Sequence, residues 1–184
     1  MKISRAEIII LIVSVVIFSS CSDSNKVKKI MSEFIETEIV IPDDLHYIYN
    51  RNIIQINKDN LKPNKFIIYY DSLECYSCKI SHLMEICPLY EMGDTCNFSV
   101  ITIFDPISED FENIRQQVLI ANYPFPVYID KNSSFKSNNK TLPKDARFHY
   151  FLINSKNLPI FVGNPLSNQQ LNELFINVLN VINN

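Results

Sequence analysis

Two cysteines in the pattern Cys-x-x-Cys restrict the fold and the chemistry of this chain more than any other feature. Cys75 and Cys78 follow an apolar run over residues 66–70 that is rich in strand-forming residues, and they precede a helix-like stretch over residues 79–87. In the first turn of a helix, unpaired backbone N–H groups and the positive end of the dipole stabilise a thiolate. A spacer of two residues places the second cysteine one turn further on, within reach of a disulfide. The pattern therefore predicts a redox pair where a strand meets a helix.

The first twenty residues have the composition of a bacterial export signal. Lys2 and Arg5 are followed by an apolar run over residues 8–18, which is too short to span a bilayer comfortably. The run ends in small residues before Cys21, and this resembles the lipobox of bacterial lipoproteins. We expect a signal peptide over residues 1–20, a lipid on Cys21 that binds the membrane, and a place in the cell envelope facing the periplasm, with the outer membrane as the default. An uncleaved membrane anchor and an ordinary cleaved signal are the alternatives.

The composition excludes several classes of partner and ligand. The 184 residues carry 17 Lys and Arg against 20 Asp and Glu, a formal net charge of −3 without a basic cluster, which argues against nucleic acid as a partner. The only glycines are Gly93 and Gly163, so no glycine-rich loop can cradle a phosphate. We expect no cofactor and a monomer. Beyond the signal, the chain is long enough for one domain with a real core and too short for two.

Periodicity predicts an α/β domain. Runs that are apolar on both faces favour central strands over residues 66–70 and 98–104, covered by helices on each side. The other expected elements are a helix over 27–36, short strands over 37–41, 47–49 and 53–56, a helix over 108–122, an edge-like strand over 124–130, a polar loop over 131–144, hairpin strands over 148–153 and 158–162, and a helix over 167–182. We divide the chain into the signal, a tether with a short helix (21–36) and the domain (37–184).

This order of elements, with the cysteine pair after the central strand, resembles the thioredoxin fold. The chain is more narrowly similar to membrane-anchored, exported thiol–disulfide oxidoreductases of the cytochrome-maturation type. The stretches that carry the resemblance are 71–79, 123–130, and 151–154 leading to 162–165. It implies a thioredoxin-like domain with a central mixed sheet flanked by helices. It also implies that Cys75 attacks, that Cys78 resolves, and that the partners are exported protein thiols or disulfides, or a membrane electron donor. The physics agrees, because the first-turn position lowers the pKa of Cys75 while Cys78 is expected to be more buried.

Two features near the cysteine pair depart from that family. Glu74 stands where the family usually has a tryptophan or a small residue, and its carboxylate opposes formation of the Cys75 thiolate. The place of the family's cis-proline, just before residues 151–153, holds Phe-His-Tyr, and the nearest proline, Pro143, lies too early. His149 lies in that place and is a candidate modulator of the Cys75 thiolate. The alternative is a strand histidine without a role at the site.

The remaining two cysteines invite a second bridge. Four cysteines in an oxidising compartment, once the lipidated one is set aside, allow three pairings. We expect a structural disulfide between Cys87 and Cys96 beside the Cys-x-x-Cys bridge, because residues 88–95 contain a proline and a Gly-Asp turn signal that can fold the chain back. The alternative is two unpaired thiols.

His82 indicates metal binding as an alternative function. It follows Cys78 by four residues and so shares a helix face with it. Cys75, Cys78 and His82 are soft ligands of the kind that copper(I) or zinc prefers. The alternatives to thiol–disulfide exchange are therefore a copper or zinc carrier or assembly module, and a scaffold whose disulfide is only structural. A peroxidase is set aside, because no threonine lies between Pro63 and Cys75.

Overall fold

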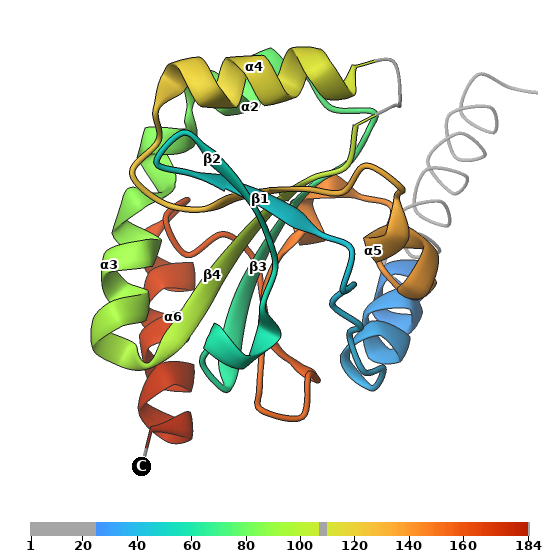
Figure 1. Cartoon of the computed structure of the whole chain (residues 1–184). Coiled ribbons are helices and arrows are strands. Elements are labelled where there is room, and N and C mark those ends of the chain that lie inside the picture. The colour runs from blue at the N-terminus through green and yellow to red at the C-terminus, as the bar shows by residue number, and fades with distance from the viewer. Residues whose placement is uncertain (1–24, 107–109, 184) are drawn as a thin grey trace, which may run out of the picture.

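The computed structural model describes residues 25–106 and 110–183. Within them, seven strands form one mixed sheet in the order β2-β1-β5-β4-β3-β6-β7 (Figure 1). The strands are β1 (His46–Tyr49), β2 (Asn52–Gln55), β3 (Asn64–Tyr70), β4 (Phe98–Phe104), β5 (Val127–Ile129), β6 (Tyr150–Ile153) and β7 (Pro159–Val162). β3 lies near the centre, parallel to β4 and antiparallel to β6.

Helices cover both faces of the sheet. They are α2 (Tyr76–Ser81), α3 (Cys87–Cys96), α4 (Phe111–Ala121), α5 (Ser134–Asn138) and α6 (Gln169–Ile182), with 3₁₀ turns η1 (Lys58–Asn60), η2 (Leu83–Ile86) and η3 (Ala146–Phe148). Residues 25–35 are also helical. In Figure 1, α3 and α6 lie on one side of the sheet, and α5 lies with the blue helix of residues 25–35 on the other. Each side therefore has its own layer of helices and its own core.

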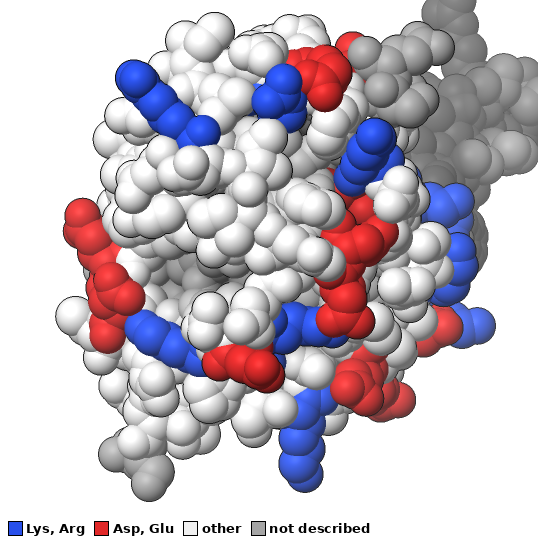
Figure 2. Space-filling model, in the orientation of Figure 1, with Lys and Arg blue, Asp and Glu red and all other residues white. Residues whose placement is uncertain are grey.

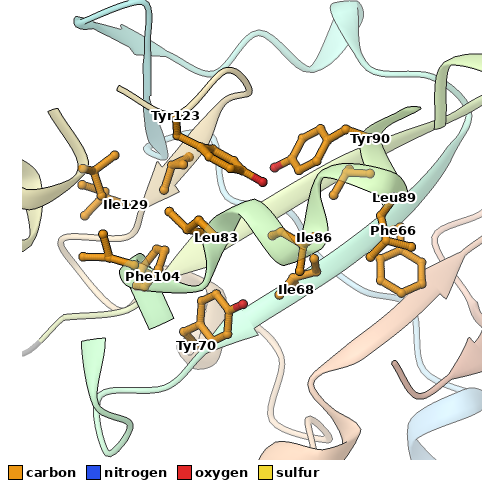
Figure 3. Packing of buried hydrophobic residues seen from close by; sticks show 14 of the residues in the cluster. Phe66, Ile68, Tyr70, Leu83, Ile86, Leu89, Tyr90, Phe104, Tyr123 and Ile129 are labelled. Carbon is orange, nitrogen blue, oxygen red and sulfur yellow. The ribbon is translucent and has the colours of Figure 1, made fainter. Parts of the chain in front are cut away.

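The alternation of side chains along β3 divides the core into two clusters. Phe66, Ile68 and Tyr70 pack under α2, α3, α4 and α6, and Figure 3 shows Phe66 beside Leu89 of α3 and Ile68 beside Ile86 of η2. The intervening Ile67 and Tyr69 pack in the second cluster with residues 25–35 and α5. Successive residues of a strand point to opposite faces, so a strand that is apolar throughout must be covered twice. The prediction of a central strand over residues 66–70 is confirmed.

The connections confirm the thioredoxin-like fold. β3 passes through α2 and α3 to the parallel strand β4. β6 returns antiparallel on the other side of β3, β7 pairs antiparallel with β6, and α6 follows. The β1–β2 hairpin extends the sheet beyond β5. The predicted mixed α/β sheet flanked by helices is therefore present.

Several predicted elements differ in the structure, and the helix-like stretch over residues 79–87 is interrupted, because α2 ends at Ser81 and η2 separates it from α3. Residues 37–41 are not a strand, and Val40 donates its N–H to the Asn139 side chain (2.8 Å) rather than to a neighbouring strand. β5 is an interior strand between β1 and β4 instead of an edge. The loop over residues 131–144 contains the short helix α5. The differences at residues 37–41 and at β5 depend on partners that lie far away in the sequence, whereas the start of α5 is held locally by the Asp130 carboxylate, which accepts the N–H groups of Ser134 and Phe135.

The predicted disulfide between Cys87 and Cys96 is wrong. Both thiols are free, because residues 87–96 form the continuous helix α3 with one cysteine at each end. A rise of about 1.5 Å per residue separates the two Cα atoms by roughly 13 Å, whereas a disulfide needs about 7 Å or less. The proline lies in the first turn of α3, where it is tolerated.

This correction gives a first testable prediction. The oxidised chain, alkylated under denaturing conditions without prior reduction and then digested, should carry the label on both Cys87 and Cys96 and on neither cysteine of the Cys-x-x-Cys pair. Mass spectrometry of the peptides measures this directly, and a fully reduced sample is the control. A peptide pair linked through Cys87 and Cys96 would contradict the helical assignment of α3.

The predicted signal peptide over residues 1–20 and the lipid on Cys21 lie outside the described residues. No helix in the described part of the chain combines the length and apolar character that crossing a membrane requires. Within residues 25–35, which fall in the segment we expected to be a tether with a short helix, Phe34 is fully buried and packs edge to face on Phe151, with ring centroids 5.1 Å apart. This helix is therefore part of the packed unit.

Candidate redox site

Cys75 and Cys78 form a disulfide at the junction that the sequence predicts, with their Cα atoms 5.4 Å apart. β3 ends at Tyr70, a turn of four residues follows, and Cys75 is the N-cap of α2. Cys75 Sγ accepts the backbone N–H of Cys78 (3.4 Å), and Lys79 donates its N–H to the Cys75 carbonyl (3.0 Å). A sulfur that accepts an amide hydrogen bond is stabilised as an anion. The disulfide therefore lies where one of its sulfurs can leave as a thiolate.

Both sulfur-bearing residues are exposed. Cys78 is therefore not shielded as expected, because α2 points Tyr76 and Ile80 into the core and leaves the intervening positions 77 and 78 on the outside. The disulfide is consequently accessible from the side of either cysteine.

Asp71 shapes the turn that carries the disulfide. Its carboxylate accepts the Leu73 N–H (3.0 Å) and the Ser72 hydroxyl (3.2 Å), its carbonyl accepts the Glu74 N–H (2.9 Å), and Lys136 of α5 forms an ion pair with it (2.7 Å). Burial opposes ionisation of this carboxyl, but the hydrogen bonds from Lys136 and Leu73 outweigh it and hold the pKa of Asp71 below its ordinary value of 3.8. An aspartate that accepts the N–H two residues on is a recognised turn signal, which sequence inspection could have found.

The Asp71 pKa leads to a pH-dependent prediction. Because the pKa is lowered in the folded state, the stabilisation is complete above the unfolded-state pKa and is lost as the pH falls through the folded-state pKa. Asp71→Asn should therefore reduce the free energy of unfolding by about 1–2 kcal/mol at pH 7. The difference from the wild type should shrink as the pH drops below the ordinary value of 3.8. Urea unfolding across pH 3–7, roughly the range over which carboxyls titrate, measures the loss of unfolding free energy at pH 7 and its decrease at low pH.

The exposed Asp59 of η1 gives the matched control for this experiment. Asp59→Asn changes the same chemical group without touching the turn, so its unfolding free energy should follow the wild type across the pH range. If Asp71→Asn lowers the unfolding free energy by the same amount at every pH, the charge of Asp71 does not stabilise the turn. The effect of the substitution would then be steric.

Glu74 has a partner that the sequence analysis did not assign. Its carboxylate forms an ion pair with Lys79 (2.8 Å) and accepts the Asp71 N–H (3.2 Å), and only 15% of its side chain is exposed. The Lys79 ammonium also lies 5.2 Å from the centre of the Tyr70 ring. Since the neighbouring ammonium offsets the negative charge of Glu74, the opposition to a Cys75 thiolate that we expected from this carboxylate is reduced.

Aromatic side chains form the floor beneath α2. Tyr76 donates its hydroxyl to the Asp105 carbonyl just beyond β4 (2.5 Å), which ties the first turn of α2 to the sheet. Phe104 is fully buried and packs against Tyr70, with ring centroids 4.8 Å apart (Figure 3). It also packs against Tyr76, with ring centroids 6.1 Å apart. The Tyr70 and Tyr150 hydroxyls are hydrogen bonded (3.0 Å), and burial raises the pKa of both phenols. The start of α2 is thus held by packing as well as by its cap.

His149 does not face the disulfide, so the proposed modulation of Cys75 by this residue is wrong. The imidazole is 2% exposed, packs edge to face on Tyr69 at 5.1 Å, and has its Nε2 2.7 Å from the Pro143 carbonyl. Tyr69 belongs to the second core cluster, on the face of the sheet opposite α2. Strand parity is the physical reason, because Tyr150, one residue on, is the side chain that turns toward the α2 side.

His82 comes close to the cysteine pair without completing a metal site. It caps the C-terminus of α2 and pairs with Glu85 through Nδ1 (2.5 Å). No group of three or more His, Cys, Asp or Glu side chains in residues 25–106 and 110–183 is arranged to hold a metal ion. The structure therefore gives the metal-carrier alternative no observation in its favour.

A hollow of about 480 Å³ opens beside Cys78. It lies between α2 with η2 and the segment after β7, and its lining is Tyr70, Cys78, Lys79, His82, Glu85, Ile86, Tyr150, Asn164, Leu166 and Ser167. The segment 164–167 comes from the far end of the domain, so no local pattern in the sequence around the cysteines indicates this cavity.

No protein-family model and no curated protein matches this chain. Solved structures with a similar fold include an uncharacterised thioredoxin-like protein of Porphyromonas gingivalis, at 15% identity and a TM-score of 0.47, covering 80% of this chain and 94% of that one. AhpC of Mycobacterium tuberculosis is similar at 13% identity and a TM-score of 0.48, covering 80% and 96%. BF1870 of Bacteroides fragilis, a conserved protein of unknown function, is similar at 13% identity and a TM-score of 0.44, covering 76% and 99%. Such identities say nothing of activity.

Proposed function

We propose that this chain exchanges disulfides with the thiols of partner proteins through Cys75 and Cys78. One observation carries the proposal, namely an exposed disulfide at the first turn of α2 in which Cys75 Sγ accepts the Cys78 N–H. A disulfide that only staples a fold gains nothing from exposure or from a stabilised leaving sulfur. Those two properties instead favour attack and release of thiolates.

The positions of the two sulfurs determine the order of the steps in the proposed thiol–disulfide exchange. In the reduced chain, the Cys75 thiolate attacks one sulfur of a partner disulfide, and the other partner sulfur leaves as a thiolate. The Cys78 thiolate then attacks Cys75 Sγ, which closes the Cys75–Cys78 bond and releases the partner as a dithiol. The pair loses two electrons and the partner gains them, and the reverse sequence oxidises a partner. The Cys78 N–H stabilises Cys75 whenever it carries the charge.

The same proposal places the chain at the cell envelope. Support comes from the sequence over residues 1–21, where a basic start, an apolar run and Cys21 fit a lipid-anchored exported protein. Exported protein thiols or disulfides, or a membrane electron donor, are the proposed partners of a monomer. On the face shown in Figure 2, Lys and Arg side chains lie among Asp and Glu rather than in one basic patch, which suits protein partners better than nucleic acid.

Trapping tests this proposal. In a Cys78→Ser chain the mixed disulfide on Cys75 cannot be resolved, so it should accumulate in the native cell and appear as higher-mass species on non-reducing gels. A Cys75→Ser/Cys78→Ser chain, which keeps Cys87 and Cys96, is the matched control and should show none of these species. Failure of Cys78→Ser to form adducts beyond the double variant would count against exchange and for a structural disulfide.

A further inference from the structure

The cavity beside Cys78 offers an approach to one sulfur of the disulfide. Cys78 belongs to its lining and Cys75 does not. Its volume of about 480 Å³ falls within the range of small-molecule sites. A nucleophile attacks a disulfide at one sulfur while the other leaves. A small thiol held in this cavity would therefore reach Cys78 Sγ, with Cys75 as the leaving sulfur.

The walls of the cavity carry groups of both charges. Lys79 provides an ammonium, which also pairs with Glu74 (2.8 Å), and Glu85 provides a carboxylate that pairs with exposed His82. Asn164 and Ser167 add neutral hydrogen-bonding groups from the segment after β7. An anion would meet Lys79 favourably and Glu85 unfavourably, and a cation the reverse. A ligand that carries both an ammonium and a carboxylate therefore matches this wall better than a ligand with only one of the two charges.

We infer that the cavity binds a low-molecular-weight thiol with an α-amino acid group, and that this thiol reduces the Cys75–Cys78 disulfide by attack on Cys78. The inference rests on the proposed exchange function, for which it supplies the source of electrons. The carboxylate of the ligand lies toward Lys79 and its ammonium toward Glu85. Its sulfur is left facing Cys78.

The step balances as two successive exchanges. The ligand thiolate attacks Cys78 Sγ, a ligand–Cys78 disulfide forms, and the Cys75–Cys78 bond breaks with its electron pair on Cys75. A second thiolate of the same class then attacks the ligand sulfur of this mixed disulfide. The ligand disulfide departs and Cys78 is left as a thiolate. Two thiols are oxidised for each disulfide reduced, and their two protons balance the two thiolates formed.

The direction of attack agrees with the surroundings of Cys75. The thiolate that leaves is the one that accepts the Cys78 N–H at 3.4 Å, and a stabilised thiolate leaves faster. On the Cys75 side of the pair, Leu73 of the preceding turn is 90% exposed. This is the side from which protein partners would reach Cys75 in the proposed exchange. Small thiols and protein partners would thus use different sulfurs.

Rates of reduction of the oxidised full chain test the inference. The probes are cysteine, cysteamine and 3-mercaptopropionate, and each rate is divided by the rate at which the same thiol reduces a small model disulfide at the same pH and ionic strength, because thiolates differ in intrinsic nucleophilicity. Cysteine should react about fivefold faster than either singly charged thiol, the size expected for exposed charge pairs. In Glu85→Gln, the advantage of cysteine over 3-mercaptopropionate should disappear. Glu112→Gln, which alters the exposed i,i+3 pair with Arg115 on α4, is the matched control and should retain it.

The position of the first adduct gives the second readout. Reactions quenched early with an alkylating agent should carry the probe on Cys78 and the alkyl group on Cys75. Adducts mainly on Cys75, or equal rates for the three thiols in wild type and Glu85→Gln, would overturn the inference and leave the exchange function intact. A disulfide that none of the thiols opens would overturn both.

Discussion

Replacing Cys75 with serine is expected to lower the rate of disulfide reduction in a reporter protein by about a thousandfold or more, as the loss of a catalytic nucleophile does. Cys75 is the sulfur that the N-cap geometry stabilises as a thiolate. Serine keeps the size and the capping hydrogen bond of this position, so the loss cannot be assigned to the fold. Turnover of the reporter disulfide, with the reduced chain regenerated by dithiothreitol, measures the effect.

The free cysteine at the start of α3 provides the control. Cys87→Ser removes a thiol of intermediate exposure that is not part of the disulfide, so its turnover should match that of the wild type. Far-ultraviolet circular dichroism verifies that both variants fold. Turnover by Cys75→Ser within a few-fold of the wild type would show that the chemistry depends on another group.

Replacing Phe104 with alanine is expected to cause the largest loss of stability at the site, about 3–5 kcal/mol. The ring is fully buried at the end of β4 and packs against Tyr70 (Figure 3). It also packs against Tyr76 in the first turn of α2. Alanine leaves a cavity that this well-covered cluster can fill only in part. Guanidinium unfolding of the oxidised chain measures the free energy.

A conservative change at the same position separates packing from chemistry. Phe104→Leu keeps most of the apolar volume and should cost less than half as much as alanine. The reporter turnover of folded Phe104→Ala should fall as well, because the cap of α2 loses its support. An unfolding free energy of Phe104→Ala within about 1 kcal/mol of the wild type would contradict the packing assigned to this ring.

The sequence predicted the fold where local pattern and burial agree. Residues 66–70 and 98–104 are apolar on both faces, and this leaves a covered central strand as the simplest outcome. The edge assignment of residues 124–130 failed because β1, the outer neighbour of β5, comes from a distant part of the chain. Strand pairing of this kind has no local signal.

Gly93 shows why the predicted second bridge failed. As a Gly-Asp pair it is typical of a turn, but in α3 it serves packing. A Cβ at this position would lie 2.7 Å from the Phe98 carbonyl oxygen, so glycine permits close contact between α3 and the start of β4. Turn and packing roles of a glycine look alike in a sequence.

The cysteine pair of the candidate site could be predicted from the sequence, but the side chains that surround the pair could not. The disulfide between Cys75 and Cys78 at the start of a helix was confirmed. The assignment of His149 depended on strand parity, where an error of one residue reverses the face. The ion pair of Asp71 with Lys136 joins residues 65 positions apart, and only the tertiary fold brings such groups together.

Equilibrium titration of the oxidised full chain in thiol–disulfide buffers tests the central claim most directly. Alkylation of Cys75 and Cys78 at each buffer potential gives the fraction of open disulfide. We expect a midpoint between about −120 and −270 mV, the range of exchange proteins. A bridge that stays closed below about −300 mV, as structural disulfides do, would contradict the account.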